Sequence, residues 1–530
     1  MPVEPKNSAS QTSTSQTDVI SFLSDPHNHG ETETVQRIDT HAAIVFLAGP
    51  LAYKIKRDVS YPFLDFSTLE KRQQACQHEL EVNQTYAQQI YISTVAITRQ
   101  ADNGLKINGT GEVVEWAVLM KRFDENQTLD NIIDQGPLAD CLADSLAREM
   151  ARGHAIAPIK KTANWVANLR QYINHNTDAF DRHPDIFSPV QAEHLTTVSI
   201  SNYKQIKPLL EQRQTIGHVR LCHGDAHLGN IVLLDNQPVY FDAIEFNDEI
   251  ATTDVLYDLA FLLMDLWHRG HWREANLILN RYLIETQSIK SAETNHYHSH
   301  YQGLAALPFF MMMRAMIRAR VTTSRRKFCP EDQLTTLTDQ ARSYFATACH
   351  FMDETPPKLI AIGGLSGSGK STVAVNIASE IGRAPGAVIL RSDIIRKKMF
   401  NVAETEHLPQ SAYNKTTTQA VYEHLYKTAA RILTTGHSVI IDAVFARETE
   451  RDAIAQIGQS TGTSFNGIWL NAPQKTLIDR VSARTNDASD ADEIIVKQQL
   501  TYDPGPISWT KINSSGKPVE VAERAKTACL

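Results

Sequence analysis

A glycine-rich run of eight residues, GLSGSGKS at residues 364–371, matches the phosphate-loop pattern G-x-x-x-x-G-K-[ST]. The apolar run at 359–362 before it predicts a buried strand, and the residues from Thr372 onward predict a helix. Glycines let backbone N–H groups surround an anion, and a helix N-terminus adds partial positive charge. The run therefore predicts a strand, a phosphate-binding turn and a helix, which constrain this part of the chain to an α/β nucleotide-binding domain.

The residues of this run have predicted roles. Lys370 is expected to reach the β- and γ-phosphates of a nucleotide, and the Ser371 hydroxyl is expected to bind Mg²⁺. The predicted nucleotide-binding set is Gly364, Leu365, Ser366, Gly367, Ser368, Gly369, Lys370, Ser371 and Thr372.

The rest of this domain predicts a parallel sheet. Strands are predicted at 359–363, 387–391, 438–442 and 467–471, and helical stretches alternate with them. Such alternation favours a doubly wound α/β fold of the P-loop NTPase type. A polar, proline-rich linker at 353–358 precedes the first strand, so the domain is predicted to span 359–530.

Charged side chains follow the predicted strands. Asp393 and Asp442 stand at strand ends, with Arg396 one helical turn after Asp393, and doubly wound sheets bind ligands at the carboxyl ends of their strands. Arg480 and Arg484 lie four residues apart before a polar stretch, a pattern typical of a lid that closes over phosphates. This set resembles the gluconate kinase, adenylylsulfate kinase and zeta-toxin group. The resemblance implies catalysis by Asp393, substrate binding by Arg396, nucleotide binding by Arg480 and Arg484, and metal binding by Ser371 and Asp442.

The N-terminal part of the chain has a different pattern. Residues 42–47 and 52–56 predict a hairpin around Gly49-Pro50, and the capping box Ser67–Glu70 predicts a helix to about residue 89. An apolar strand is predicted at 116–123, after which the pattern is helical to residue 352 except at 218–246. A β-rich lobe at about 30–123 and a helical lobe at about 124–352 together predict an α+β, protein-kinase-like bilobal domain over 19–352. The polar residues 1–18 predict a disordered tail.

The interruption in the helical lobe carries a second phosphate-handling motif. Residues 221–230 read LCHGDAHLGN, which spaces Asp225 and Asn230 as in the kinase catalytic loop. The aspartate of that loop accepts the proton of the attacking hydroxyl, and the asparagine binds Mg²⁺. Two short strands follow, and the second ends on Asp242, where protein kinases place a metal-binding aspartate.

This motif resembles the aminoglycoside phosphotransferase family and its choline and fructosamine kinase relatives. The whole chain resembles bacterial bifunctional proteins that join such a domain to a C-terminal P-loop domain. The resemblance implies that Asp225 is the catalytic base and that Asn230 binds magnesium. Asp242 is the second implied metal ligand, with Glu245 as the alternative. The β-rich lobe has no G-x-G-x-x-G loop and offers only Gly49-Pro50.

A kinase-like fold also needs a lysine for the α- and β-phosphates and a helical glutamate that holds it. Lys54 and Lys56 lie on one face of the predicted strand 52–56, and Lys54 is the predicted nucleotide-binding lysine. Glu79, on the helix that follows, is its predicted partner, and Glu81 is the alternative.

Composition narrows the possible functions. The net charge of −8 argues against a large nucleic-acid footprint. The six cysteines form no C-x-x-C pair, which indicates reduced thiols in a cytoplasmic protein rather than a disulfide or zinc framework. No apolar run reaches the roughly 18 residues of a membrane span, and no signal peptide or membrane partner is expected.

The sequence thus predicts an ATP- and Mg²⁺-dependent kinase with two nucleotide sites that phosphorylates hydroxyl groups of small molecules. Two alternatives remain open at this point. One domain, the N-terminal one for preference, could be a nucleotide sensor that regulates the other. A nucleic-acid kinase is the second alternative, which the acidic charge balance disfavours.

Overall fold

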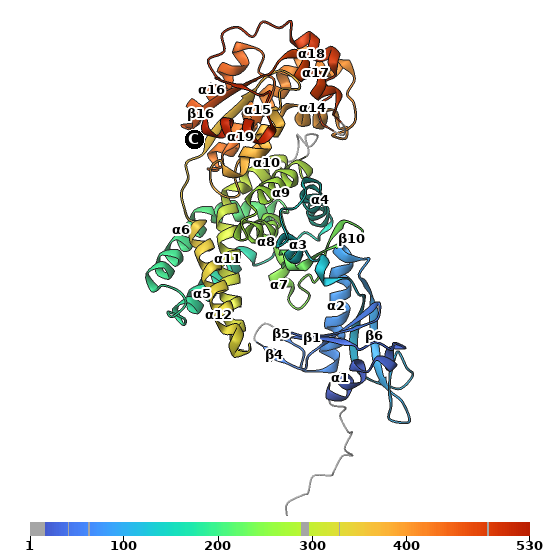
Figure 1. Ribbon diagram of the computed structural model, residues 1–530. Helices are drawn as coiled ribbons and strands as arrows, with labels where there is room; N and C mark the ends of the chain where they lie inside the picture. The colour runs from blue at the N-terminus through green and yellow to red at the C-terminus, as the bar shows by residue number, and fades with distance from the viewer. Residues whose placement is uncertain are drawn as a thin grey trace, which may run out of the picture. The chain divides into compact units, whose positions relative to one another are not determined.

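The computed structural model describes residues 16–40, 42–61, 64–287, 296–327, 329–484 and 487–529. The N-terminal sheet is drawn in blue in Figure 1. Within these ranges it has six strands in the order β1-β2-β3-β8-β6-β7. The hairpin between β2 and β3 turns at Gly49 and Pro50, which confirms the sequence-based expectation. The strands of the six-stranded sheet are β1 (Gln36–Asp39), β2 (Ala43–Ala48), β3 (Leu51–Lys56), β6 (Tyr91–Arg99), β7 (Leu105–Ile107) and β8 (Glu112–Lys121). The short strands β4 (Ser60–Tyr61) and β5 (Leu64–Asp65) form a separate two-stranded sheet.

Two helices accompany this sheet, and both begin differently from the sequence-based expectation. Helix α1 (Gln16–Ser24) starts inside the predicted tail and buries Val19 and Leu23 in the core of the sheet; residues 1–15 lie outside the described residues. Helix α2 (Leu69–Ala87) is capped by Thr68 rather than Ser67. Thr68 has extended backbone angles, and its hydroxyl accepts a hydrogen bond from the Lys71 amide, which suits a capping residue.

The segment that interrupts the helical part folds as a hairpin. Strand β10 (Ile231–Leu234) pairs antiparallel with β11 (Gln237–Tyr240) around a turn at Asp235 and Asn236, both of which have positive φ. Asparagine and aspartate tolerate this left-handed conformation better than other non-glycine residues. The short helix η3 (Leu228–Asn230) precedes the hairpin and carries the end of the HGDAHLGN motif.

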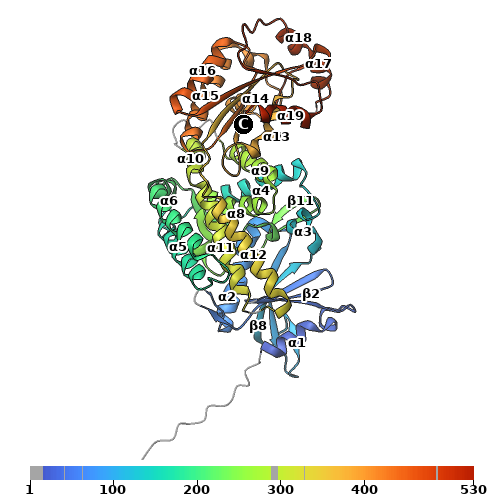
Figure 2. The same cartoon turned by 60° about the vertical axis from the view of Figure 1, so that its left-hand side comes forward.

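The helical part of the chain follows the predicted range except at β12 (Thr252–Asp254), a short strand that pairs with β9 (Val219–Leu221) and lies beyond the predicted interruption at 218–246. Helices α11 and α12 run side by side in both views (Figures 1 and 2). Asp254 caps α8 and forms a buried ion pair with Arg213, whose Nε lies 2.6 Å from Oδ2. The described helices are α3 (Leu129–Ile133), α4 (Asp140–Ile156), α5 (Trp165–Asp181), α6 (Pro189–Thr215), α7 (Asp248–Ala251), α8 (Val255–His268), α9 (Trp272–Glu285), α10 (His296–Gly303), α11 (Leu307–Arg325) and α12 (Leu334–His350).

The C-terminal sheet is parallel and, in the described residues, has five strands in the order β14-β15-β13-β16-β17. The four predicted strands are confirmed, whereas the edge strand β17 was not predicted. Alternate residues of β13 face opposite ways: Ile360 and Ile362 pack with α13 and α19, and Leu359 lies beside Gly458 of α16. The elements are β13 (Lys358–Gly363), α13 (Lys370–Ile377), β14 (Val388–Arg391), α14 (Ser392–Phe400), α15 (Lys415–Thr434), β15 (Val439–Asp442), α16 (Glu448–Thr461), β16 (Ser464–Asn471), α17 (Gln474–Ser482), α18 (Glu493–Gln499), β17 (Thr510–Asn513) and α19 (Pro518–Thr527).

Helix α9 covers the outer edge of β14. In an edge strand, alternate backbone groups point away from the sheet and lack a partner strand. Here Asn280 Oδ1 accepts a hydrogen bond from the Ile389 amide at 2.7 Å, and its Nδ2 donates to the Ala387 carbonyl at 3.1 Å. Asn276 Nδ2 donates to the carbonyls of Pro385 and Ala387, both at 3.0 Å. Two buried asparagines therefore take the place of a neighbouring strand.

Contacts divide the chain into two compact units, Met1–Gln135 with Leu221–Thr253, and Gly136–Arg220 with Asp254–Leu530. The β-rich sheet, the β10–β11 hairpin and helices α1, α2, α3 and α7 belong to the first unit, and helices α4–α6 and α8–α12 and the parallel sheet belong to the second. The domain boundaries predicted at 19–352, 353–358 and 359–530 stay predictions. No helix in the described ranges combines the length and the apolar character that crossing a membrane requires.

Candidate functional site

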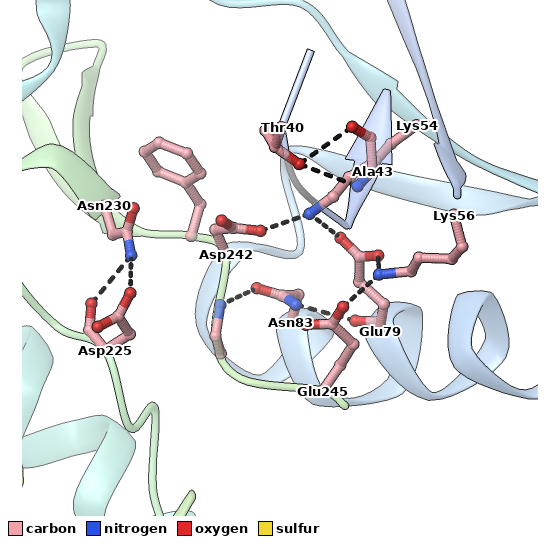
Figure 3. Close-up of polar contacts among 12 residues, drawn as sticks. Thr40, Ala43, Lys54, Lys56, Glu79, Asn83, Asp225, Asn230, Asp242 and Glu245 are labelled. Carbon is pink, nitrogen blue, oxygen red and sulfur yellow. Dashed lines mark hydrogen bonds and ion pairs between the residues drawn. The ribbon is translucent and has the colours of Figure 1, made fainter. Parts of the chain in front are cut away.

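The first candidate site lies between the β-rich sheet and the catalytic-loop hairpin. Strand β3 carries Lys54, whose Nζ lies 2.7 Å from Glu79 of α2 and 2.6 Å from Asp242 (Figure 3). The predicted lysine–glutamate pair is therefore present, whereas Glu81 is exposed and pairs instead with His78 at 3.8 Å. Burial opposes ionisation of Glu79, but the ammonium groups of Lys54 and Lys56 outweigh it and hold its pKa below the ordinary value.

The two carboxylates considered for metal binding have different surroundings. Asp242 follows β11 with a left-handed φ of 59°, and its side chain is 44% exposed. Glu245 is 9% exposed and pairs with the buried Lys56. The two candidate metal ligands therefore differ in exposure: the Asp242 carboxylate faces the opening of the site, whereas the Glu245 carboxylate is enclosed.

The catalytic-loop residues lie together on the other side of Asp242 in Figure 3. Asn230 Nδ2 donates to the Asp225 backbone carbonyl at 3.0 Å and to its carboxylate at 3.1 Å. The His223 ring, which is fully buried, bonds to the Phe241 carbonyl at 2.9 Å and so links this loop to the hairpin. The spacing of the motif places both functional groups on one short, well-braced turn.

Two further residues help to hold the N-terminal site together, although they belong to no motif and were not predicted from the sequence. Asn83 accepts a hydrogen bond from the Ala243 amide at 2.9 Å and donates to the Glu79 carbonyl, which ties α2 to the turn after β11. The only sequence signal for it is its position one helical turn after Glu79. The Tyr91 hydroxyl accepts from the Asp242 amide at 3.2 Å.

The loop that joins the first two strands also differs from the expectation. In a kinase, the loop between the first and second strands covers the phosphates. Gly49-Pro50 lies instead between β2 and β3, the second and third strands. In this chain β1 ends at Asp39 and β2 begins at Ala43, and Thr40 Oγ1 bonds to both the amide and the carbonyl of Ala43, at 2.9 and 3.0 Å. A threonine hydroxyl therefore braces the start of β2.

The second candidate site is the phosphate loop. Gly364 and Gly367 have φ of 139° and 82°, and a Cβ at either position would lie 2.6 Å or less from a backbone carbonyl oxygen. Only glycine fits both positions. Lys370 Nζ donates to the Leu365 carbonyl at 3.2 Å, and burial lowers the pKa of this lysine. The loop therefore has the geometry predicted for the run GLSGSGKS.

The predicted metal-binding pair of this site is in contact. Ser371 Oγ donates to Asp442 Oδ2 at 2.5 Å, although the two residues are 71 positions apart in the sequence. Arg391, at the end of β14, also approaches Asp442 at 3.4 Å and bonds to Asp487 of the polar stretch after α17 at 3.0 Å. Arg391 was not predicted, because an arginine at the end of a strand has no distinctive sequence signal.

The structure places Asp393 and Arg396 on α14, next to this pair. Asp393 is half-buried, and this burial raises the pKa of its carboxyl group. Arg396 is buried; its Nη1 donates to the Ala412 carbonyl at 2.7 Å, and its guanidinium lies 4.9 Å from the centre of the Tyr413 ring. Arg396 thus shapes the wall of the site by contacts within the protein.

Arg480 and Arg484, the arginines predicted to form a lid, have separate partners. Arg480 donates to the Gly367 carbonyl of the phosphate loop at 3.4 Å and to the Ser514 carbonyl at 2.7 Å. Arg484 lies 3.6 Å from Asp487. Residues 485 and 486 of the predicted polar stretch lie outside the described residues.

Both sites offer the chemistry that Mg²⁺ prefers. Magnesium is a hard cation that binds oxygen ligands such as carboxylates, and it keeps several waters. The N-terminal site offers the oxygens of Asn230 and Asp242, and the phosphate-loop site offers those of Ser371 and Asp442. The 2.5 Å contact between Ser371 and Asp442 shows that their oxygens can converge on one small ion.

Comparison with known proteins supports two kinase-related segments. Residues 68–290 match the sequence model of the Phosphotransferase enzyme family, and residues 359–504 match that of the AAA domain. Lys54 and Lys56 precede the first matched segment. Uncharacterized proteins of Mycobacterium tuberculosis and Mycobacterium bovis are 26% identical over 486 residues, which cover 88% of this chain and 90% of theirs.

Among solved structures, a sugar kinase from Janibacter sp. is 21% identical, with 33% of this chain and 94% of that chain covered and a TM-score of 0.26. An ethanolamine kinase from Plasmodium vivax is 10% identical, with 59% and 81% covered and a TM-score of 0.36. Because both TM-scores lie below 0.5, neither neighbour decides a residue role or a substrate.

Proposed function

We propose that this chain is an ATP-dependent phosphotransferase with two nucleotide sites, each of which phosphorylates a hydroxyl group of a small molecule. One observation carries the proposal: each site combines a partly buried lysine with oxygen-bearing side chains suited to Mg²⁺. The two sets are Lys54 with Asn230 and Asp242, and Lys370 with Ser371 and Asp442. Asn230 and Asp242 lie within the matched segment 68–290, and Lys54 precedes it. The second set lies entirely within the matched segment 359–504.

In the N-terminal site, Asp225 would accept the proton of the attacking hydroxyl, and Asn230 would hold this aspartate in place through its amide. Lys54 would exchange Asp242 for the α- and β-phosphates while it keeps Glu79. Bound Mg²⁺ would neutralise charge on the phosphates. Catalysis of phosphoryl transfer depends mainly on positioning and charge neutralisation, so little else is required of the protein.

In the phosphate-loop site, the loop amides and Lys370 would hold the phosphates, and Ser371 and Asp442 would hold Mg²⁺. The half-buried Asp393 would accept the proton of the acceptor hydroxyl. Arg480 and Arg484 would close over the phosphates and exclude water, which strengthens every electrostatic contact inside the site.

Asp242 is the second metal ligand of the N-terminal site in this proposal. Its side chain is 44% exposed and already pairs with the nucleotide-binding lysine. Glu245 is enclosed with Lys56, and moving it away from this cation would break a buried ion pair and leave Lys56 with Glu79 alone, which is costly.

Titration with a non-hydrolysable ATP analogue tests the proposal. Two sites per chain are expected in the presence of Mg²⁺, and Lys370→Ala and Lys54→Met should each remove one. Matched controls are the exposed lysines, Lys475→Ala near the phosphate loop and Lys71→Met on α2, which should leave both sites intact. A single site that survives both active-site substitutions would contradict the proposal.

A phosphate-transfer screen against hydroxylated metabolites then tests catalysis and the acceptor class. Transfer that disappears in Asp225→Asn assigns an acceptor to the N-terminal site, and transfer that disappears in Lys370→Ala assigns one to the other. Binding at the N-terminal site without transfer to any acceptor would instead identify that site as a nucleotide sensor.

A further inference from the structure

The buried carboxylate of Glu79 lies between two lysines instead of one. Its Oε1 is 2.7 Å from Lys54 Nζ, and its Oε2 is 2.6 Å from Lys56 Nζ (Figure 3). Kinase-like folds require one lysine at this place, and Lys54 fills that role in the proposed function. Lys56 is therefore a second cation whose purpose the phosphate chemistry does not explain.

The two lysines differ in their other partners and in their exposure. Lys54 is 13% exposed and pairs with the half-exposed Asp242, so an arriving nucleotide can take the place of this carboxylate. Lys56 is 1% exposed and pairs with Glu245. Because leaving a buried ammonium without a partner costs several kcal/mol, Lys56 remains with Glu79 and Glu245 whatever occupies the site.

Lys56 thereby connects two elements that are distant in the sequence. Glu79 lies on α2, and Glu245 lies in the turn that carries Asp242. The hydrogen bond from the Ala243 amide to Asn83 of α2 runs parallel to this connection. One buried cation therefore bridges the helix that holds the nucleotide-binding lysine and the turn that holds the proposed metal ligand.

We propose that Lys56 is a positioning residue that locks α2 to the turn at 242–245, so that Glu79 stays in place and Glu245 stays away from the metal. Asp242 is then the carboxylate of this turn that faces the nucleotide. The inference rests on the proposed N-terminal ATP site for its effect on binding, whereas the connection itself is testable without nucleotide.

The first test is hydrogen exchange of the whole, nucleotide-free chain. In Lys56→Met the amides of α2 and of residues 242–245 should exchange at least about tenfold faster together, whereas Lys71→Met should leave them unchanged. Unchanged exchange of both segments in Lys56→Met would overturn the proposal, whether or not the site binds ATP.

The second test separates positioning of Glu79 from simple neutralisation of Glu245. The Lys370→Ala variant is expected to keep only the N-terminal nucleotide site. In this background, Lys56→Met should weaken binding of the Mg²⁺–ATP analogue about tenfold or more, as the loss of other residues that orient metal ligands does. The double variant Lys56→Met/Glu245→Gln removes both charges of the outer pair and should remain as weak, because Glu79 still lacks its second lysine.

Recovery of the parental affinity in the double variant would overturn the proposal, because it would show that Lys56 acts only by neutralising the charge of Glu245. Lys56→Arg keeps a cation that can bond both carboxylates, and it should recover most of the affinity. If Lys56→Met fails to fold, the comparison of Lys56→Arg with the parent still decides: a loss of tenfold or more in a folded Arg variant, with unchanged exchange in α2, would contradict a locking role.

Discussion

Substitution of Asn280 tests how the helical part of the chain holds the edge of the parallel sheet. The Ile389 amide points away from the sheet, and its acceptor is Asn280 Oδ1 at 2.7 Å. The preceding amide, that of Val388, points into the sheet and donates to the Ser438 carbonyl at 2.9 Å. Asn280→Ala removes the acceptor of the first amide and leaves the second untouched.

The expected size of the effect follows from the burial of this contact. A buried N–H group left without an acceptor costs about 1–3 kcal/mol. A value of about 2 kcal/mol corresponds to roughly a 30-fold change in an equilibrium constant. A water molecule that enters the space could accept the hydrogen bond of the amide and lower the energetic cost. The amide would then be in contact with solvent and could exchange its hydrogen. We therefore expect the Ile389 amide to exchange about 30-fold faster in Asn280→Ala.

Hydrogen exchange read by mass spectrometry with single-residue fragmentation measures this change. The Val388 amide is the internal control and should keep its rate. Asn276→Ala leaves the Ile389 acceptor in place and should have a smaller effect on this amide, while the exposed Asn174→Ala on α5 should have none. An unchanged Ile389 rate would refute the assignment of Asn280 as its partner, and equal acceleration of Val388 would indicate general unfolding of the strand instead.

Loss of this contact should also reach the phosphate-loop site. Strand β14 ends at Arg391, which pairs with Asp442 and Asp487, and Asp393 follows on α14. A strand that opens more often positions these side chains less well. Nucleotide binding at this site should therefore weaken in Asn280→Ala, by no more than the roughly 30-fold that the opening itself allows.

Three further outcomes are expected. Asp225→Asn should lower N-terminal transfer by about 10²–10⁴-fold and leave ATP binding intact, as for the loss of other catalytic bases; unaltered turnover would show that Asp225 is not the base. Asp242→Asn should weaken Mg²⁺-dependent nucleotide binding more than Glu245→Gln does, and the reverse order would move the metal to Glu245. Burial raises the folded-state pKa of Asp393 above its ordinary 3.8, so its protonated form stabilises the fold at low pH and this contribution is lost as pH rises through the raised pKa. Asp393→Asn should accordingly gain stability relative to the parent as the pH rises above 3.8 and through the raised pKa, and a pH-independent difference in melting temperature would contradict it.

The sequence by itself determined the features that depend on local backbone geometry. The run GLSGSGKS requires glycines at positions where a Cβ would strike a carbonyl, and the structure has positive φ at Gly364 and Gly367. The spacing of Asp225 and Asn230 predicted one short turn, and the amide of Asn230 contacts Asp225 there. Apolar runs bounded by turn residues predicted four of the five described C-terminal strands, since the apolar pattern of a buried strand is visible within a short window of sequence.

The missed strand and the misplaced helix cap show the limit of short windows. Strand β17 has one buried residue, Ile512, and three exposed ones, so its short sequence is too polar to stand out as a strand. The cap of α2 moved by one residue because Ser67 and Thr68 are both good capping residues. The backbone conformation of Thr68 decides between them.

Tertiary structure alone decided the pairs between residues far apart in the chain. Lys56 and Glu245 are 189 positions apart, and Asn280 and Ile389 are 109 apart, so no spacing rule connects them. A charged or amide side chain on a strand or helix is compatible with solvent, with a structural partner or with a ligand. The packing of remote elements selects among these by setting which groups are buried, because a buried charge or amide must find a partner and an exposed one need not.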